Sequence, residues 1–242
     1  MNLNLARVFA DAAALWRHDR DLWLRVAGFL FFVPALALKI FLPLPELRNL
    51  TPEAAQLALL AWLQVQALWL LAYFVAQTFG FGVVLTLLLD ANRPSLAAAM
   101  LRTVRQLPWL VLAYLAVLLL VGFGFTFFIV PGLYILGRTF LTMPILIAEP
   151  KRGPLGALIG AVQLSHRRGW LFLLVPTIAF CTAYFVAGMV GAVGGVLGAE
   201  TQPVVRVLFD VLMAVVATAS ALAQALLQAA AYRGVIAARQ GI

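Results

Sequence analysis

The sequence predicts an all-α polytopic membrane protein with six transmembrane helices, three interfacial amphipathic helices and both termini in the cytoplasm. Hydrophobic residues make up 64% of the 242 residues and charged residues only 11%, whereas a soluble domain carries about 25% charged residues. Pro and Gly recur within long apolar runs, where neighbouring membrane helices accommodate them. Basic residues recur in separate clusters beside those runs, which is typical of cytoplasmic loops.

The chain begins with an amphipathic pattern over residues 2–20, in which apolar residues recur at helical spacing. Shorter patterns of the same kind follow at residues 95–107 and 155–162. A helix of this type lies along the membrane interface or packs its apolar side on the protein's own helices. These two interpretations do not exclude each other.

Six apolar segments have about the length that a membrane-spanning helix needs, roughly 20 residues. They are residues 22–42, 67–89, 109–130, 132–148, 170–197 and 203–231. The second segment belongs to a longer helix, because Thr51-Pro52-Glu53 is a typical helix start: a capping hydroxyl, proline at the first position and an acid in the first turn. We expect this helix to run from Pro52 to Asp90.

The third and fourth segments form a hairpin without a polar loop. Only Pro131 and Gly132 separate the two apolar runs, so these residues are the predicted hairpin turn. Exposed backbone polar groups are costly in hydrocarbon. We therefore expect the turn to be sunk in the bilayer or covered by protein.

Arg138 and Asp210 are charged residues that lie well inside predicted spans, away from their ends. A charge within a span costs roughly 2.5–3.5 kcal/mol and normally has a partner. Each lies seven residues in from a proline at the outer side, Pro131 and Pro203, so both are expected at a similar depth. The sequence predicts an Arg138–Asp210 intramembrane ion pair, which either fixes helix packing or contacts an anionic ligand.

The distribution of charge predicts the threading, because the segments assigned to the inner side carry most of the basic residues. The basic residues of the second and third inner clusters are candidate contacts for anionic headgroups at the inner surface. They are Arg102, Arg105, Lys151, Arg152, Arg167 and Arg168.

The fifth predicted span carries a series of glycines. Gly191 and Gly195 form one GxxxG pair, and Gly194 and Gly198 form another. Such pairs permit close approach of two membrane helices. We expect Gly191, Gly195 and Gly198 to serve helix packing within the chain, with dimerisation as the alternative.

The chain reads as a single membrane domain over residues 1–242. Three units of similar plan divide it at 1–90, 91–150 and 151–242, each with an amphipathic helix, a span and a returning span. Trp23, Trp109 and Trp170 each begin an odd-numbered span. The similarity reflects either duplication or the rules shared by all membrane segments.

No catalytic, metal-binding or cofactor-binding motif is evident in the sequence, and no cofactor is expected. His18 and His166 lack the Cys or carboxylate spacing of a metal site, and Ser165-His166 are adjacent, a poor geometry for a nucleophile and its base. Cys181 is the only cysteine and lies in an apolar run. The net charge of +8 is divided among clusters, which argues against a nucleic-acid partner.

The run from Val130-Pro-Gly-Leu-Tyr134 through Arg138, Pro144 and Glu149 to Gly169-Trp170 resembles the membrane domain of some glycerophosphoryl diester phosphodiesterases. It also resembles related bacterial inner-membrane proteins. The resemblance implies a bacterial cytoplasmic-membrane location. It implies no catalysis here, because in that family the activity belongs to a separate soluble domain whose acidic and histidine motif this sequence lacks.

The sequence favours a non-enzymatic membrane protein that organises envelope components or contacts lipids, with membrane lipids and a further membrane protein as expected partners. The alternative is a small transporter or lipid-handling protein with a cavity near Arg138 and Asp210. An intramembrane enzyme is a third hypothesis. The sequence does not indicate an oligomeric state.

Overall fold

The computed structural model describes residues 4–42, 45, 50–90, 92, 94–166, 169–198 and 202–240, and all regular secondary structure in these ranges is helical. The helices are α1 (Leu5–His18), α2 (Arg20–Ala27), α3 (Val33–Phe41), α4 (Pro52–Leu89), α5 (Leu96–Phe127), α6 (Ile129–Thr139), α7 (Thr142–Ala148), α8 (Gly153–His166), α9 (Gly169–Val196) and α10 (Pro203–Gln240). A π-helical turn, Gly28–Phe32, joins α2 to α3, so that residues 20–41 form one span.

Six helical segments within the described ranges are long and apolar enough to cross a membrane. They are Arg20–Phe41, Pro52–Leu89, Leu96–Phe127, Ile129–Ala148, Gly169–Val196 and Pro203–Arg239. The all-α class and the number of candidate spanning segments predicted from the sequence are confirmed for the described residues, and the chain has the architecture of a multi-pass membrane protein. The membrane side of the termini and the interfacial placement of the amphipathic segments stay predictions.

The predicted start of α4 is confirmed, and so is its N-terminal cap. Thr51 is extended, and its side-chain oxygen accepts a hydrogen bond from the backbone N–H of Ala54 at 3.3 Å. Pro52 follows at the first position, where the absence of an N–H costs nothing. The helix then runs unbroken for 38 residues to Leu89, about 57 Å at 1.5 Å per residue.

The second amphipathic segment is not a separate helix, which corrects the sequence prediction. Residues 96–127 form one helix that continues through Pro108. Proline removes one backbone hydrogen bond, but a membrane helix packed among others tolerates that loss. The apolar run after Pro108 therefore continues the same axis as the basic segment before it.

The hairpin turn also lies elsewhere than predicted. Phe128, in extended conformation, separates α5 from α6, and Pro131 and Gly132 lie in the first turn of α6. The first N–H groups of a helix have no partner within it, so proline fits there and starts the helix instead of interrupting it. Two glycines permit the close hairpin: a Cβ on Gly124 would lie 2.9 Å from the Cα of Gly132, and a Cβ on Gly132 would lie 2.5 Å from the ring of Phe125.

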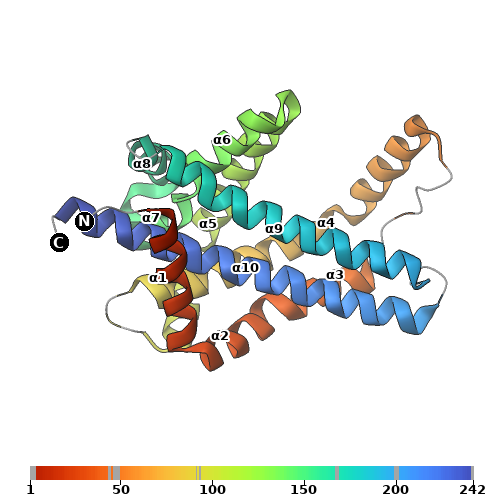
Figure 1. Cartoon of the computed structure of the whole chain (residues 1–242), viewed down its shortest axis with the longest axis horizontal. Helices are drawn as coiled ribbons and strands as arrows, with labels where there is room; N and C mark the ends of the chain where they lie inside the picture. The colour runs from red at the N-terminus through yellow and green to blue at the C-terminus, as the bar shows by residue number, and fades with distance from the viewer. Residues whose placement is uncertain are drawn as a thin grey trace.

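The α5–α6 hairpin projects away from the α9–α10 pair. In Figure 1, the tip of the hairpin lies level with a middle part of the α9–α10 pair, not with either of its ends. Phe128 at the tip is 77% exposed, and its neighbours Ile129 and Val130 are exposed as well. The protein itself therefore does not cover this tip, and its large apolar side chains are suited to hydrocarbon. Its placement within the bilayer stays a prediction.

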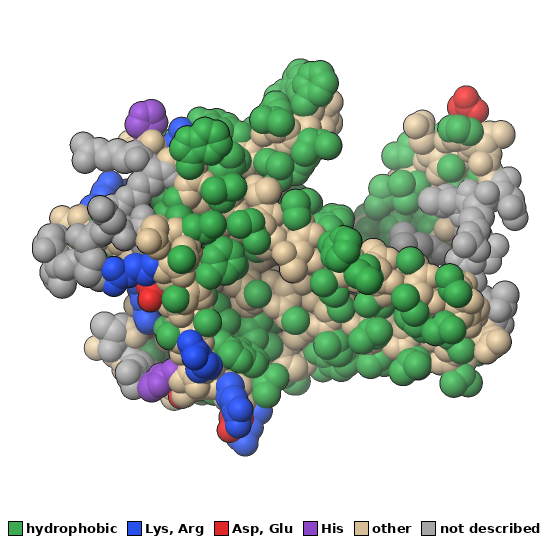
Figure 2. Space-filling model, viewed as in Figure 1, with side chains coloured by type: hydrophobic (Ala, Val, Ile, Leu, Met, Phe, Trp, Pro, Cys, Tyr) green, Lys and Arg blue, Asp and Glu red, His purple; other side chains and the backbone are tan. Residues whose placement is uncertain are grey.

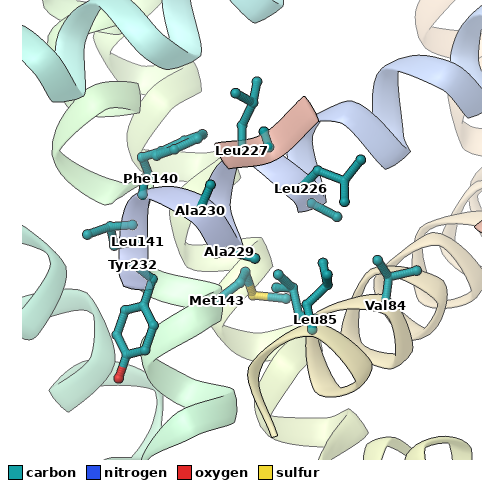
Figure 3. Packing of buried hydrophobic residues seen from close by; sticks show 14 of the residues in the cluster. Val84, Leu85, Phe140, Leu141, Met143, Leu226, Leu227, Ala229, Ala230 and Tyr232 are labelled. Carbon is teal, nitrogen blue, oxygen red and sulfur yellow. The ribbon is translucent and has the colours of Figure 1, made fainter. Parts of the chain in front are cut away.

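The hydrophobic core lies where α4, α7 and α10 meet. In Figure 3, Ala229 of α10 lies next to Met143 of α7, which in turn lies next to Leu85 of α4. Helix α1 crosses the C-terminal part of α10 (Figure 1) and buries Val8 there. The apolar side of α1 therefore packs at least partly on the protein itself.

Candidate functional site

Lys, Arg and His side chains gather at the end of the molecule that contains α1, α8 and the C-terminal part of α10, as Figure 2 shows on its visible face. The opposite end holds the start of α4, with Glu53 in its first turn. We call the first of these the basic end. It is the place where the sequence predicts contacts with anionic headgroups.

A cavity of about 560 Å³ lies at the basic end between α4, α5 and α7. Its lining combines charged and polar side chains with apolar ones: Thr86, Leu89, Asp90, Arg102, Arg105, Gln106, Ile147, Ala148 and Pro150. We call this the α4–α5–α7 cavity. Two of the candidate lipid-contacting arginines, Arg102 and Arg105, therefore lie in one site.

The two arginines of this cavity are in different electrostatic states. Arg102 forms an ion pair through Nη1 with Oδ2 of Asp90, whose other oxygen accepts a hydrogen bond from the backbone N–H of Asn92 at 2.9 Å. Arg105 forms no hydrogen bond or ion pair with any residue in the described ranges. As far as the described residues show, the lining therefore carries one neutralised guanidinium, on Arg102, and one without a partner, on Arg105.

The wall of the cavity is held by the crossing of α4 and α5. Gly82 of α4 lets α5 approach closely, because a Cβ at Gly82 would lie 2.6 Å from Cγ2 of Thr103. One turn further, the hydroxyls of Thr86 and Thr103 lie 3.5 Å apart. This close crossing fixes the spacing between Asp90 at the end of α4 and the arginines of α5.

A second hollow, of about 570 Å³, lies between α4 and α5. Its lining is apolar throughout: Leu68, Leu71, Ala72, Val75, Ala76, Phe79, Val104 and Leu107. It offers no side chain that can contact a charged group. Of the two hollows, only the α4–α5–α7 cavity has the chemistry of a headgroup site.

The remaining predicted inner-surface contacts divide into three cases. Lys151 is exposed. Arg152 donates through Nε to Oε2 of Glu149 at 2.5 Å, and its side chain lies over Gly156 and Gly160 of α8. Arg167 and Arg168 lie outside the described residues.

The structure does not bring Arg138 and Asp210 together, which corrects the predicted ion pair. Arg138 donates to the hydroxyl of Tyr134 through Nε at 3.0 Å and Nη2 at 2.8 Å, and to Oγ of Ser165 through Nη1 at 3.4 Å. The nearest cation to Asp210 is its own helical neighbour Arg206, with 4.0 Å between Nε and Oδ2. Neither described cavity includes Arg138 or Asp210.

The prediction was wrong because equal residue counts do not give equal positions. Helix α6 begins at the projecting hairpin tip, not beside the start of α10 (Figure 1). The side chain of Arg138, on α6, therefore reaches Ser165 at the C-terminal end of α8. Tyr134 had a sequence signal, since it lies four residues before Arg138 on the same helical face, whereas Ser165 had none.

The predicted packing glycines also need correction. A Cβ on Gly191 or Gly195 would meet nothing within 4 Å, so neither serves a contact within the chain. Gly198 has a φ of 75° and follows the end of α9, where a left-handed residue is favoured. The glycine that does pack against α10 is Gly194, whose Cβ would lie 2.9 Å from the ring of Phe209.

The closest helix approach involving α9 was missed by the sequence analysis. A Cβ on Gly137 of α6 would lie 2.4 Å from the carbonyl oxygen of Phe172. Gly137 directly precedes Arg138, so this crossing places the arginine beside α8 and α9. A single glycine without a GxxxG partner gave no signal for it.

No protein-family model, curated protein or solved structure matches this chain. Within the described residues, no group of three or more His, Cys, Asp or Glu side chains is placed to hold a metal ion. The chemistry of the site therefore has to be argued from its own residues.

Proposed function

We propose that this chain is a non-enzymatic integral membrane protein of the bacterial cytoplasmic membrane whose basic end contacts anionic lipid headgroups. The observation that carries the proposal is the concentration of Lys, Arg and His at one end of a helical body whose remaining visible surface is largely apolar (Figure 2). Such a polarised molecule has one end suited to an anionic leaflet surface.

The orientation follows from the same asymmetry. Basic residues near the ends of spans favour the cytoplasmic side, and each one close to an anionic surface contributes about 1 kcal/mol of attraction. Helix α1 and the C-terminal part of α10 lie at the basic end (Figure 1). The proposal therefore places both termini in the cytoplasm.

Kinship with the membrane domain of glycerophosphoryl diester phosphodiesterases is part of the proposal. Its support is the sequence run from Val130, beside the hairpin tip, to Trp170, which includes Arg138 and Ser165. In the structure these two polar residues contact each other across α6 and α8. A membrane domain of this kind would organise partners or lipids and leave chemistry to other proteins.

The transporter alternative finds less support. It needs a cavity at Arg138 and Asp210, but these residues have separate partners and line neither described hollow. Lipid handling is still compatible with the α4–α5–α7 cavity, which lies elsewhere.

Native mass spectrometry after gentle extraction tests the proposal. The protein is reconstituted in nanodiscs that contain equal parts of phosphatidylglycerol and phosphatidylcholine, and the lipids retained after release are counted. Phosphatidylglycerol should be enriched, and the enrichment should fall as salt is raised because exposed charges are screened. Equal retention of the two lipids at low salt would refute the lipid-contact function.

A further inference from the structure

The α4–α5–α7 cavity carries a more specific assignment, which rests on the proposed function. Asp90 neutralises Arg102, and Arg105 is left free among the described residues. Among the described residues, the charged side chains that line the cavity thus sum to one positive charge. A ligand that matches this charge carries one negative charge.

The depth of the cavity points to a lipid. Trp109 lies one helical turn after Arg105 on α5 and is 55% exposed, and exposed tryptophans collect at the headgroup level of a membrane. Leu101 and Val104, beside Arg105 on the same helix, are exposed apolar side chains. A molecule held by Arg105 would therefore have its polar part at the cavity and apolar surface within reach.

The available donors suit a phosphate group. A guanidinium forms two parallel hydrogen bonds with phosphate oxygens, and the amide of Gln106 is a further donor in the lining. The volume of about 560 Å³ lies within the usual range for small-molecule sites, about 300–1,000 Å³. The Asp90 carboxylate is 15% exposed, and it disfavours a second negative charge on the ligand.

We propose that the α4–α5–α7 cavity binds the singly charged phosphodiester headgroup of one membrane phospholipid, with Arg105 as the main phosphate contact and Gln106 as a second donor. The Asp90–Arg102 ion pair forms the fixed wall that selects a phosphodiester over a doubly charged phosphomonoester. The acyl chains lie over the exposed apolar side of α5 that begins at Leu101 and Val104.

Three variants of the full chain in phosphatidylglycerol–phosphatidylcholine nanodiscs test the site. Arg105→Gln removes the free charge, and Ala148→Trp fills the cavity without changing charge. Arg239→Gln removes a charge from the exposed end of α10, outside the cavity lining, as the matched control. Arg105→Gln and Ala148→Trp should each lower the occupancy of the last retained phosphatidylglycerol about tenfold, which corresponds to the loss of one good contact. Arg239→Gln should leave that occupancy unchanged.

The outcomes separate this site from the proposed function. If all three variants lose lipid equally, or if neither cavity variant loses any, the cavity assignment is overturned while the general affinity for anionic lipid stands. If the unaltered protein shows no preference for phosphatidylglycerol, both fail. Thermal unfolding of each variant in detergent identifies any loss of lipid that comes from misfolding, and Arg105→Lys, which retains the charge, should then restore most of the occupancy.

The source of the phosphate is tested in the same preparation. Phosphatidic acid, a phosphomonoester, should be retained less than phosphatidylglycerol. Inorganic phosphate and glycerol phosphate should not displace the bound lipid at millimolar concentration. Displacement by either soluble anion would overturn the lipid assignment in favour of a free phosphate compound, and preferred retention of phosphatidic acid would overturn the selection by Asp90.

Discussion

The Nη2 of Arg138 donates a hydrogen bond to the hydroxyl of Tyr134 at 2.8 Å, and the guanidinium carbon lies 5.0 Å from the centroid of the same ring. One tyrosine thus supplies both an acceptor and an aromatic face. A charge that the sequence pairs with a distant carboxylate is held by a residue one turn away. The cation is satisfied locally, so it does not fix the position of α10.

A double-mutant cycle separates the two arrangements. Tyr134→Phe and Arg138→Gln should show a coupling of roughly 1 kcal/mol, because the pair is linked by a charged hydrogen bond that is partly exposed. Arg138→Gln and Asp210→Asn should be additive within about 0.5 kcal/mol, as expected for sites without shared partners. Unfolding free energies in mixed detergent give both cycles. A larger coupling energy in the second cycle would support the Arg138–Asp210 ion pair that the sequence predicts.

Gly137 should be the least tolerant glycine of α6. A Cβ there would lie 2.4 Å from the carbonyl oxygen of Phe172, so Gly137→Ala forces α6 and α9 apart. We expect a loss of roughly 1–3 kcal/mol, as for other overpacked cores, measured by thermal unfolding in detergent. Gly191→Ala is the matched control, because its Cβ meets open space. Equal stability of the two variants would contradict the close α6–α9 crossing.

The hairpin tip should reject a charge. Val130 is exposed at the end of the projecting α5–α6 hairpin, so Val130→Asp would place a carboxylate in hydrocarbon at a cost of about 2.5–3.5 kcal/mol. The fraction of protein resistant to carbonate extraction should fall. Val204→Asp, at the exposed start of α10 near Arg206, should insert normally. Equal insertion of both variants would place the tip at a membrane surface.

Single cysteines test the threading. In a Cys181→Ser background, a cysteine at Glu53, in the first turn of α4, should react in intact cells with a maleimide that does not cross the cytoplasmic membrane. A cysteine at Ala13, on exposed α1, should react only after lysis. This contrast follows from the positive-inside asymmetry. The reverse labelling pattern would invert the proposed orientation.

Local signals predicted the ends of some elements well and others poorly. Thr51 and Pro52 start α4 as expected because a cap involves only neighbouring residues. Pro131 was misassigned because proline both ends and starts helices, and the choice depends on where the preceding helix stops. Here α5 continues to Phe127, so Pro131 falls in the first turn of the next helix.

The candidate site was predicted only in part. Arg102 and Arg105 were identified from charge clustering, since their sign and their distance from a span are visible in the chain. Asp90, Thr86 and Gln106 were not assigned to a site. Asp90 and Arg102 are separated by 12 positions, and their pairing depends on the turn between α4 and α5 and on the close crossing at Gly82.

Composition and local chemistry are enough to predict a multi-pass helical membrane protein, the number of its spanning segments and the start of α4. Apolar burial adds up along a segment, and caps act over a few residues, so both are readable without a fold. The partners of Arg138, the α4–α5–α7 cavity and the contact of Gly137 arise only in the tertiary structure. These features depend on which helix faces meet. An example is the hydrogen bond that Arg233 of α10 donates to the carbonyl of Leu88 of α4, 145 positions away in the sequence. The lateral arrangement of helices in a membrane is set by the packing of whole helix surfaces, and the GxxxG pattern alone did not identify the glycines that pack here.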